Sequence, residues 1–305
     1  MASMTDHPAV RSVDRLMILA AALLFSTGGA AVKMTSLSGW QVASLRSGFA
    51  AATLLIVLPE ARRGWSRRTW LVGSAYAGTM ITFALANKLT TAANAVFLQS
   101  VAPLYVLLLS PFLLREPISR RQLVFMAALA AGMSMIFAGA NQTFATAPDP
   151  FRGNVVGVVT GVCWALTIIG LRWLGFDRPG GSTGSSAAAA VVCGNLIACF
   201  ATMPAALPIR DVTPTDWSVV AWLGVFQVAL AYVFLVRGIR RVGALEASLL
   251  ILLEPVLSPL WAWMIHGEHP SELALLGGAV IITATAIYTW HGRNPNHTGE
   301  LGIRN

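Results

Sequence analysis

The sequence has few charged residues for its length. Of its 305 residues, 11% are charged, whereas a soluble domain usually carries about 25%. Apolar residues make up 56% of the chain, and the mean hydropathy is +0.67. This composition excludes a disordered chain and an ordinary soluble enzyme, because neither can accommodate so large an apolar fraction.

Paired cysteines and cofactor motifs are absent from the sequence. Cys163, Cys193 and Cys199 lie in apolar stretches without a CxxC spacing, which indicates small buried hydrophobic residues rather than metal ligands or a disulfide framework. His266 and His269 flank Glu268, but no further ligand of suitable spacing accompanies them. There is no GxGxxG, P-loop, HExxH or GxSxG motif. The sequence therefore predicts no cofactor, no metal site and no enzymatic activity.

Long apolar runs, in contrast, are abundant. A transmembrane helix needs about 20 mostly apolar residues, and ten runs of that length fill about 200 residues, leaving only short connections and tails. We predict an all-α integral membrane protein whose ten transmembrane helices cover residues 15–33, 40–58, 70–88, 94–114, 121–139, 153–173, 186–207, 216–237, 244–265 and 272–290.

The positions of the basic residues predict the orientation. A net charge of +8 and a pI near 10.2 would ordinarily suggest nucleic-acid binding. With the N-terminus in the cytoplasm, however, 16 of the 21 Lys and Arg residues fall in inner segments, 4 in outer segments, and Arg46 within span two. This split follows the positive-inside rule and leaves no basic stripe for a nucleic acid. We predict a multi-pass protein of the cytoplasmic (inner) membrane with both termini cytoplasmic. Its predicted partners are the lipid bilayer and a small-molecule substrate, and the sequence is compatible with a monomer.

The chain contains an internal repeat. Residues 92–116 (AANAVFLQSVAPLYVLLLSPFLLRE) align without gaps with residues 244–268 (ALEASLLILLEPVLSPLWAWMIHGE), so that Pro103 meets Pro255. Each half holds five spans, and an odd number of spans inverts the second half in the membrane, as in secondary transporters. The predicted organisation is a cytoplasmic tail (1–14), repeat one with spans one to five (15–139), an outer linker (140–152), repeat two with spans six to ten (153–290) and a second cytoplasmic tail (291–305).

These repeated segments also resemble a known family. Each half carries a late proline followed by Arg-Glu or Gly-Glu, in Ala102-Pro103…Arg115-Glu116 and Glu254-Pro255…Gly267-Glu268. With this repeated motif the chain resembles the EamA-type drug/metabolite transporters, and the resemblance covers nearly its whole length. Within that superfamily the chain is similar to YddG-type amino-acid exporters. The resemblance implies that spans 1, 3, 4, 6, 8 and 9 surround a central cavity and that spans 2, 5, 7 and 10 lie outside it. Ala102 stands where the second half has Glu254, so this acid is not a requirement of the repeat.

Two charges are not explained by the predicted topology. Glu254 lies about 10 residues into span nine, near the midplane, where an ionisable side chain costs roughly 2.5–3.5 kcal/mol on insertion scales. It is either a carboxylate that takes up a proton or binds an ammonium group, or a structural acid that braces a kink at Pro255, the counterpart of a kink at Pro103. Arg46 lies in the outer half of span two, where we expect a structural ion pair or an interfacial anchor in preference to substrate binding.

Aromatic and polar residues suggest where a substrate binds. Trp164 lies in the middle of span six, where its ring either contacts a substrate or fills the core between helices. The other nine tryptophans lie at or towards span ends, as in an aromatic belt. Polar residues on the spans assigned to the cavity complete the predicted substrate site, although each alone is more often a helix–helix hydrogen bond: Ser26, Tyr76, Thr79, Gln99, Thr167, Gln227 and Tyr232.

The sequence thus predicts a secondary transporter. We expect it to export small metabolites by alternating access around a midplane cavity. The preferred substrates are amino acids, either aromatic ones or a broad range of neutral ones. The direction of transport comes from the resemblance. Two alternatives stay open: an exporter of cationic drugs or quaternary ammonium compounds that uses Glu254, and a passive channel, against which the absence of a charged pore ring argues.

Overall fold

A computed structural model describes residues 8–113, 119–139, 145–176, 183–238, 242 and 244–291. These residues contain ten helical segments that are long and apolar enough to cross a membrane, and each overlaps one predicted span. The predicted all-α fold with ten membrane-length helices is therefore confirmed. In chain order the spans are formed by α1 (Pro8–Ser26) with α2 (Gly28–Met34); α3 (Gly39–Val57); α4 (Arg67–Leu89); α5 (Ala92–Ser100) with α6 (Ala102–Leu113); α7 (Arg120–Ala138); α8 (Pro150–Phe176); α9 (Thr183–Ala206); α10 (Pro214–Trp222), the π-helix η2 (Leu223–Leu230) and α11 (Ala231–Gly238); α12 (Ala244–Ile251) with α13 (Leu253–His266); and α14 (Glu272–His291). A short 3₁₀ helix, η1 (Pro59–Arg62), follows span two.

Several helices begin at capping boxes that are visible in the sequence. At the start of α3, the Ser38 hydroxyl accepts a hydrogen bond from the backbone N–H of Gln41, and the Gln41 side chain accepts one from the backbone of Ser38. The same reciprocal pair starts α7, and Thr213 with Asp216 starts α10. Such caps satisfy N–H groups that have no partner inside the helix, so they fix where these spans begin.

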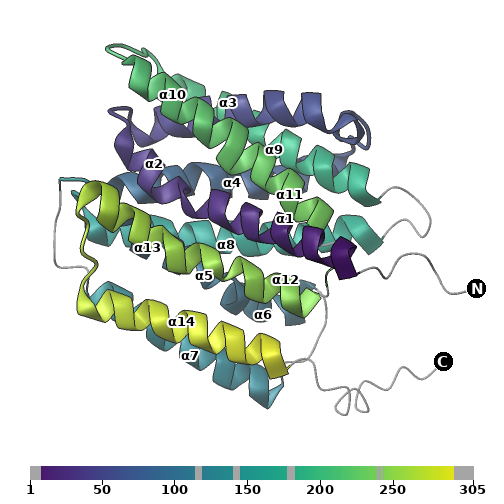
Figure 1. The fold of residues 1–305 in the computed structure, drawn as a ribbon, viewed down its shortest axis with the longest axis vertical. Coiled ribbons are helices and arrows are strands. Elements are labelled where there is room, and N and C mark those ends of the chain that lie inside the picture. Colours follow the sequence, from purple (N-terminus) through teal and green to yellow (C-terminus); the bar gives the residue numbers. More distant parts are fainter. Residues whose placement is uncertain are drawn as a thin grey trace, which may run out of the picture.

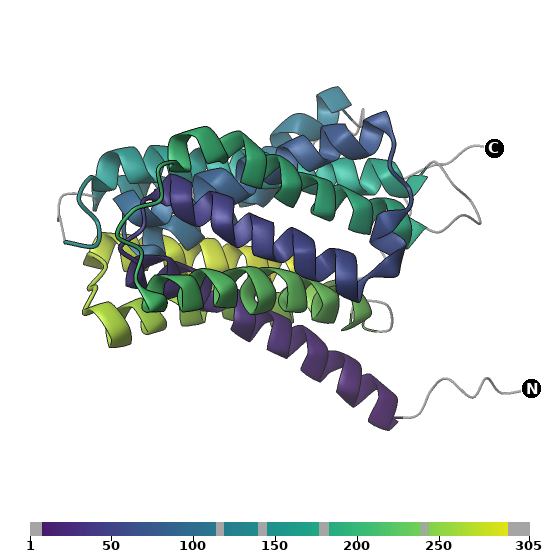
Figure 2. The ribbon, with the colours of Figure 1, turned by 90° about the horizontal axis from the view of Figure 1, so that it is seen from above.

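The helices lie side by side with similar directions, as a membrane bundle requires (Figure 1). The start of α1 and the end of α14 lie at the same end of the bundle, which we call the terminal end; the opposite end is the distal end. Viewed from above, the first turns of α1 lean out of the bundle at the terminal end (Figure 2).

Spans from the two halves of the chain pack against each other. The most extensive packing joins α4 to α8, and α3 and α4 to α9. At one edge of the bundle α7 packs along α14 (Figure 1), and α1 packs along α11. Apolar side chains such as Ile56, Val124 and Phe200 point outwards and are exposed, which suits a surface in contact with lipid.

Candidate functional site

Four spans are interrupted inside the part of the chain that the structure describes. Span one breaks at Thr27, span four at Val101 and span nine at Leu252, while span eight contains the π-helix η2. Pro103 is the second residue of α6 and Pro255 the third residue of α13. Because proline lacks an N–H, it fits best in the first turn of a helix and disturbs the hydrogen-bond ladder further in. The two residues predicted to kink the helices thus lie directly after the breaks, where interrupted helices expose backbone groups for binding polar solutes.

The break in span one is surrounded by polar side chains. The Ser26 hydroxyl donates to the carbonyl of Leu23 at 2.7 Å and accepts from Nε1 of Trp261 at 3.0 Å. From η2, Nε2 of Gln227 donates to the carbonyl of Phe25 at 3.5 Å, while Oε1 of Gln227 is buried without a partner. Spans one, eight and nine therefore meet at this break through Ser26, Gln227 and Trp261.

Trp261 corrects the predicted aromatic belt. Eight of the nine tryptophans predicted for the belt are exposed at span ends, as expected: 40, 65, 70, 173, 217, 222, 263 and 290. Trp261 is half-buried and bonded to Ser26 instead. This role is not visible in the sequence, because Trp261 lies only two residues from the exposed Trp263, on a different face of the same helix.

Trp164, Tyr76 and Tyr232 belong to one apolar cluster. Tyr76 of α4 is buried in it, and Trp164 of α8 and Tyr232 of α11 are half-buried and pack against it, together with Met80 and Leu196. Three of the predicted substrate residues, from spans three, six and eight, therefore come together inside the bundle. Aromatic rings with polar handles are suited to hold an apolar or aromatic solute group.

The two predicted threonines have a local role in this structure. Thr79 donates its hydroxyl to the carbonyl of Ala75 at 3.2 Å, and Thr167 donates to the carbonyl of Cys163 at 2.8 Å. Both side chains are at most 1% exposed. Because hydrogen bonds to the carbonyl four residues earlier are typical of threonine in a helix, these two contribute hydroxyls to their own helices. Gln99 is half-buried on α5, two residues before the break at Val101.

Glu254 lies in the first turn of α13, directly after the break in span nine. Its side chain is half-buried and makes no hydrogen bond or ion pair with any described residue. Both predicted roles of Glu254, proton or ammonium binding and bracing of the Pro255 kink, stay predictions. The geometry leaves the carboxylate available to a proton or a cationic group.

Arg46 differs from the predicted ion pair or interfacial anchor. Its side chain is 1% exposed, so it does not reach the membrane surface, and its Nη2 donates to the carbonyl of Met80 at 2.7 Å. The guanidinium lies 5.7 Å from the ring centroid of Phe83, and its buried Nε has no partner. Among the described residues no carboxylate lies within ion-pair distance of it. The reason is that α3 is covered by α4 and η2, which close the path to the interface.

A buried ion pair at the distal end joins the two halves of the chain. Nζ of Lys33 lies 2.8 Å from Oε1 of Glu268, with both side chains 1% exposed. The same ammonium donates to the carbonyls of Thr90 and Thr146, and Oε2 of Glu268 accepts from the backbone N–H of Ala92. This Lys33–Glu268 network ties span one to the ends of spans three, four and nine. The sequence places Lys33 and Glu268 in outer segments but does not indicate that they pair with each other.

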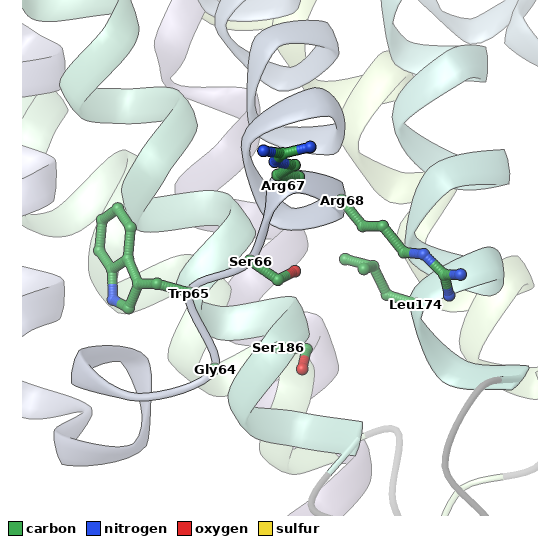
Figure 3. Close-up of a pocket in the computed structure, with 7 residues that line it drawn as sticks. All are labelled: Gly64, Trp65, Ser66, Arg67, Arg68, Leu174 and Ser186. Carbon is green, nitrogen blue, oxygen red and sulfur yellow. The ribbon is translucent and has the colours of Figure 1, made fainter.

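A surface pocket of about 600 Å³ lies at the terminal end (Figure 3). The guanidinium of Arg68 stacks 4.7 Å from the ring centroid of Trp173 beside it. Arginine and tryptophan are the residues expected at a membrane interface, and the pocket is remote in sequence from every helix break. It is therefore not the candidate transport site. Its lining residues are Gly64, Trp65, Ser66, Arg67, Arg68, Leu174 and Ser186.

Comparisons with known proteins agree with this architecture. A family model described as the EamA-like transporter family matches residues 15–138 and 151–290. The chain is 25% identical over 252 residues to the "Uncharacterized transporter YyaM" of Bacillus subtilis (strain 168), covering 79% of this chain and 80% of that protein. A protein crystal structure of 22% identity matches in fold with a TM-score of 0.59 over 92% of this chain and 98% of the other.

Proposed function

The chain belongs to the EamA-like transporter family, and on that premise we propose that it exports small metabolites, in first place amino acids, by alternating access. The membership and the transporter relative show a membrane transporter of small solutes. The observation that carries the proposal is the contrast between the two regions of the bundle: interrupted helices near its middle and a buried ionic network that closes its distal end.

The packing of the spans supports two inverted five-span halves. If the halves are related by a two-fold axis, each span corresponds to the one five places away in the chain, so span three corresponds to span eight and span six to span one. The contact between spans three and six then predicts a contact between spans eight and one, which is also present. Likewise the contact of spans four and six becomes that of spans nine and one, and the pairs two–seven, four–nine and five–ten map onto themselves. Each of these contacts is present. A two-fold exchange of this kind is the arrangement that allows the halves to rock about a central site.

The distal network gives alternating access a physical basis. Because Lys33 belongs to the first half and Glu268 to the second, their ion pair must part when the distal end opens. Two hydrogen bonds from Ser36 to Asp216, of 2.8 and 2.9 Å, also join the halves there. The structure thus corresponds to a state closed at the distal end, which the basic-residue distribution assigns to the outer face. Export, rather than uptake, rests on the resemblance to amino-acid exporters.

The aromatic cluster of Tyr76, Trp164 and Tyr232 would bind the apolar part of the solute. The backbone groups at the helix breaks, with Ser26, Gln227 and Gln99, would take its polar ends. Among the described residues, no three His, Cys, Asp or Glu side chains lie close enough together to hold a metal ion. We assign no chemical step to the protein.

Counterflow in proteoliposomes tests the proposed function. Vesicles preloaded with an unlabelled neutral amino acid should take up the same labelled amino acid faster than empty vesicles, because a carrier returns loaded more readily than empty. A panel of amino acids, amines and sugars as competitors should show the strongest inhibition by amino acids. Uptake that neither saturates nor responds to preloading would instead support a channel.

Glu254, which has no partner among the described residues, favours one second candidate, an exporter of cations. If the substrate is an amino acid, Glu254→Gln should leave its transport within about threefold of the wild type, because the substitution removes a charge but preserves the shape. If the substrate is a quaternary ammonium compound, the same variant should lose transport at least tenfold. Glu272→Gln, at an exposed position at the start of α14, is the matched control and should change neither. Retention of quaternary-ammonium transport in Glu254→Gln would contradict the second candidate, and loss of amino-acid transport in this variant would instead assign Glu254 to proton coupling.

A further inference from the structure

Arg46 is a cation in the interior of the bundle, and no described residue supplies an anion to it. Its described partners are the carbonyl of Met80, the sulfur of Met80 at 3.9 Å and the face of the Phe83 ring. A guanidinium presents five N–H donors, and here Nε is buried without any acceptor. The two ion pairs among the described residues, Lys33–Glu268 and Arg152–Asp149, do not involve it.

Close packing against η2 fixes the backbone of α3 at Arg46. A Cβ at Gly224 of η2 would lie 2.6 Å from the carbonyl oxygen of Arg46 and 2.4 Å from Cβ of Phe49. Only a glycine therefore allows η2 to approach α3 so closely. The π-helix holds the arginine inside the bundle, and π-helical turns are frequent at functional sites.

Tyr76 connects Arg46 with a second unsatisfied group. Tyr76 lies one helical turn before Met80, whose carbonyl binds Arg46, and Asn195 follows Gly194, which packs against the Tyr76 side chain. Asn195 is fully buried on α9; its Nδ2 donates to the carbonyl of Val191 at 2.9 Å, and its Oδ1 has no donor. A Cβ at Gly194 would lie 2.7 Å from Cδ1 of Tyr76, so the tyrosine ring lies flat against α9 beside Asn195.

These three residues adjoin the aromatic cluster rather than the lipid. Met80, whose carbonyl accepts from the guanidinium, and Tyr76, one turn earlier on α4, both belong to the cluster that includes Trp164 and Tyr232. Methionine is flexible and adapts its shape readily, so a rearranged Met80 side chain, whose sulfur lies 3.9 Å from Nη2 of Arg46, would let a solute held by the aromatic cluster reach the guanidinium. A buried charge beside this cluster that no described residue neutralises calls for an anionic ligand.

We propose that Arg46 and Tyr76 form a subsite for the carboxylate of the transported solute. The guanidinium would bind the carboxylate through two parallel hydrogen bonds, and Oδ1 of Asn195 would accept from the ammonium group of an amino acid. This inference rests on the proposed function and narrows it: the substrate must carry a carboxylate, and an amine of the same shape is rejected.

The test compares acids with amines on the purified full-length protein. The probes are L-phenylalanine, its methyl ester and phenethylamine, which share a ring and an amino group but differ at the carboxylate. We expect L-phenylalanine to raise the melting temperature of the wild-type protein and to compete in counterflow at least tenfold better than the other two. Arg46→Met should reduce that preference to below threefold, and Arg46→Lys should recover part of it.

A second variant separates binding from folding. Asn195→Asp keeps Arg46 and its bond to Met80 but offers an internal carboxylate to the guanidinium. It should fold at least as stably as the wild type and lose binding of L-phenylalanine at least tenfold, whereas Asn195→Ala should retain more of it. A purely structural arginine would not produce that loss.

The outcomes distinguish the two levels of the proposal. If phenethylamine binds the wild type as well as L-phenylalanine does, or if folded Arg46→Met keeps the tenfold preference, the carboxylate subsite is wrong. If L-phenylalanine binds through Arg46 but is never exchanged across the vesicle membrane, the subsite stands and the proposed carrier function fails. If none of the three probes binds the folded wild type, the subsite is overturned as stated.

Discussion

Replacing Glu268 with glutamine should destabilise the protein and open its distal end. The substitution leaves the ammonium of Lys33, which is 1% exposed, without its carboxylate in the protein interior. Removing one partner of a buried ion pair typically costs about 3–5 kcal/mol. We expect a clear fall in the melting temperature of the detergent-purified protein and at least a tenfold loss of counterflow.

Opening of the distal end can be measured separately from stability. Ala92, which is fully buried, donates its backbone N–H to Oε2 of Glu268, so a cysteine placed at this position reports on the network directly. An Ala92→Cys thiol should react with a membrane-impermeant reagent at least tenfold faster when combined with Glu268→Gln. Equal labelling rates with and without Glu268→Gln would show that the pair does not hold the distal end closed.

The double variant Lys33→Met with Glu268→Met is the informative control. Apolar side chains of similar size often replace a buried pair without loss of stability, so the double variant should regain the melting temperature that Glu268→Gln loses. Arg152→Gln changes an ion pair whose arginine side chain is 81% exposed and should cost less than about 1 kcal/mol. A double variant as unstable as Glu268→Gln would contradict the assignment of the defect to an unpaired charge.

The ten spans could be predicted because each depends on a local property. About 20 apolar residues are needed to cross a bilayer, and a run of that length is visible without any knowledge of its neighbours. The beginnings of α3, α7 and α10 follow similarly from the capping residues Ser38, Ser119 and Thr213. The breaks lie next to residues that the sequence singled out, Ser26, Pro103 and Pro255, because helix interruption depends on the residues at the break itself.

The partners of the buried charges could not be predicted, since they depend on packing between distant segments. Lys33 and Glu268 are 235 positions apart and meet only when span one lies beside span nine. From its place in the outer half of span two, Arg46 is predicted to form a structural ion pair or to anchor at the interface. Because α3 is apolar on most of its sides, its sequence does not say which face meets lipid and which is covered by α4 and η2. The same is true of Trp261, whose partner Ser26 lies on another span.

Replacing Trp164 with alanine should abolish most transport, and the interpretation of that loss needs two further variants. Removing a large aromatic side chain from a packed site costs about 3–5 kcal/mol, so alanine alone would impair transport through folding even if the ring never touched a solute. Trp164→Leu refills much of the space without a ring, whereas Trp164→Phe preserves an aromatic face.

If Trp164 contacts the solute, stability and transport should separate across this series. We expect the melting temperature to recover in both the leucine and the phenylalanine variants, but counterflow to recover to within about threefold only with phenylalanine and to remain at least tenfold low with leucine. Trp173→Leu, at an exposed position where Trp173 stacks on Arg68, should leave counterflow within about twofold. Wild-type counterflow in Trp164→Leu would assign the indole to packing between α4, α8 and α9, because a ring that binds solute cannot be replaced by a branched alkyl group that merely fills its volume. The solute would then have to be held by Tyr76, Tyr232 and the helix breaks alone.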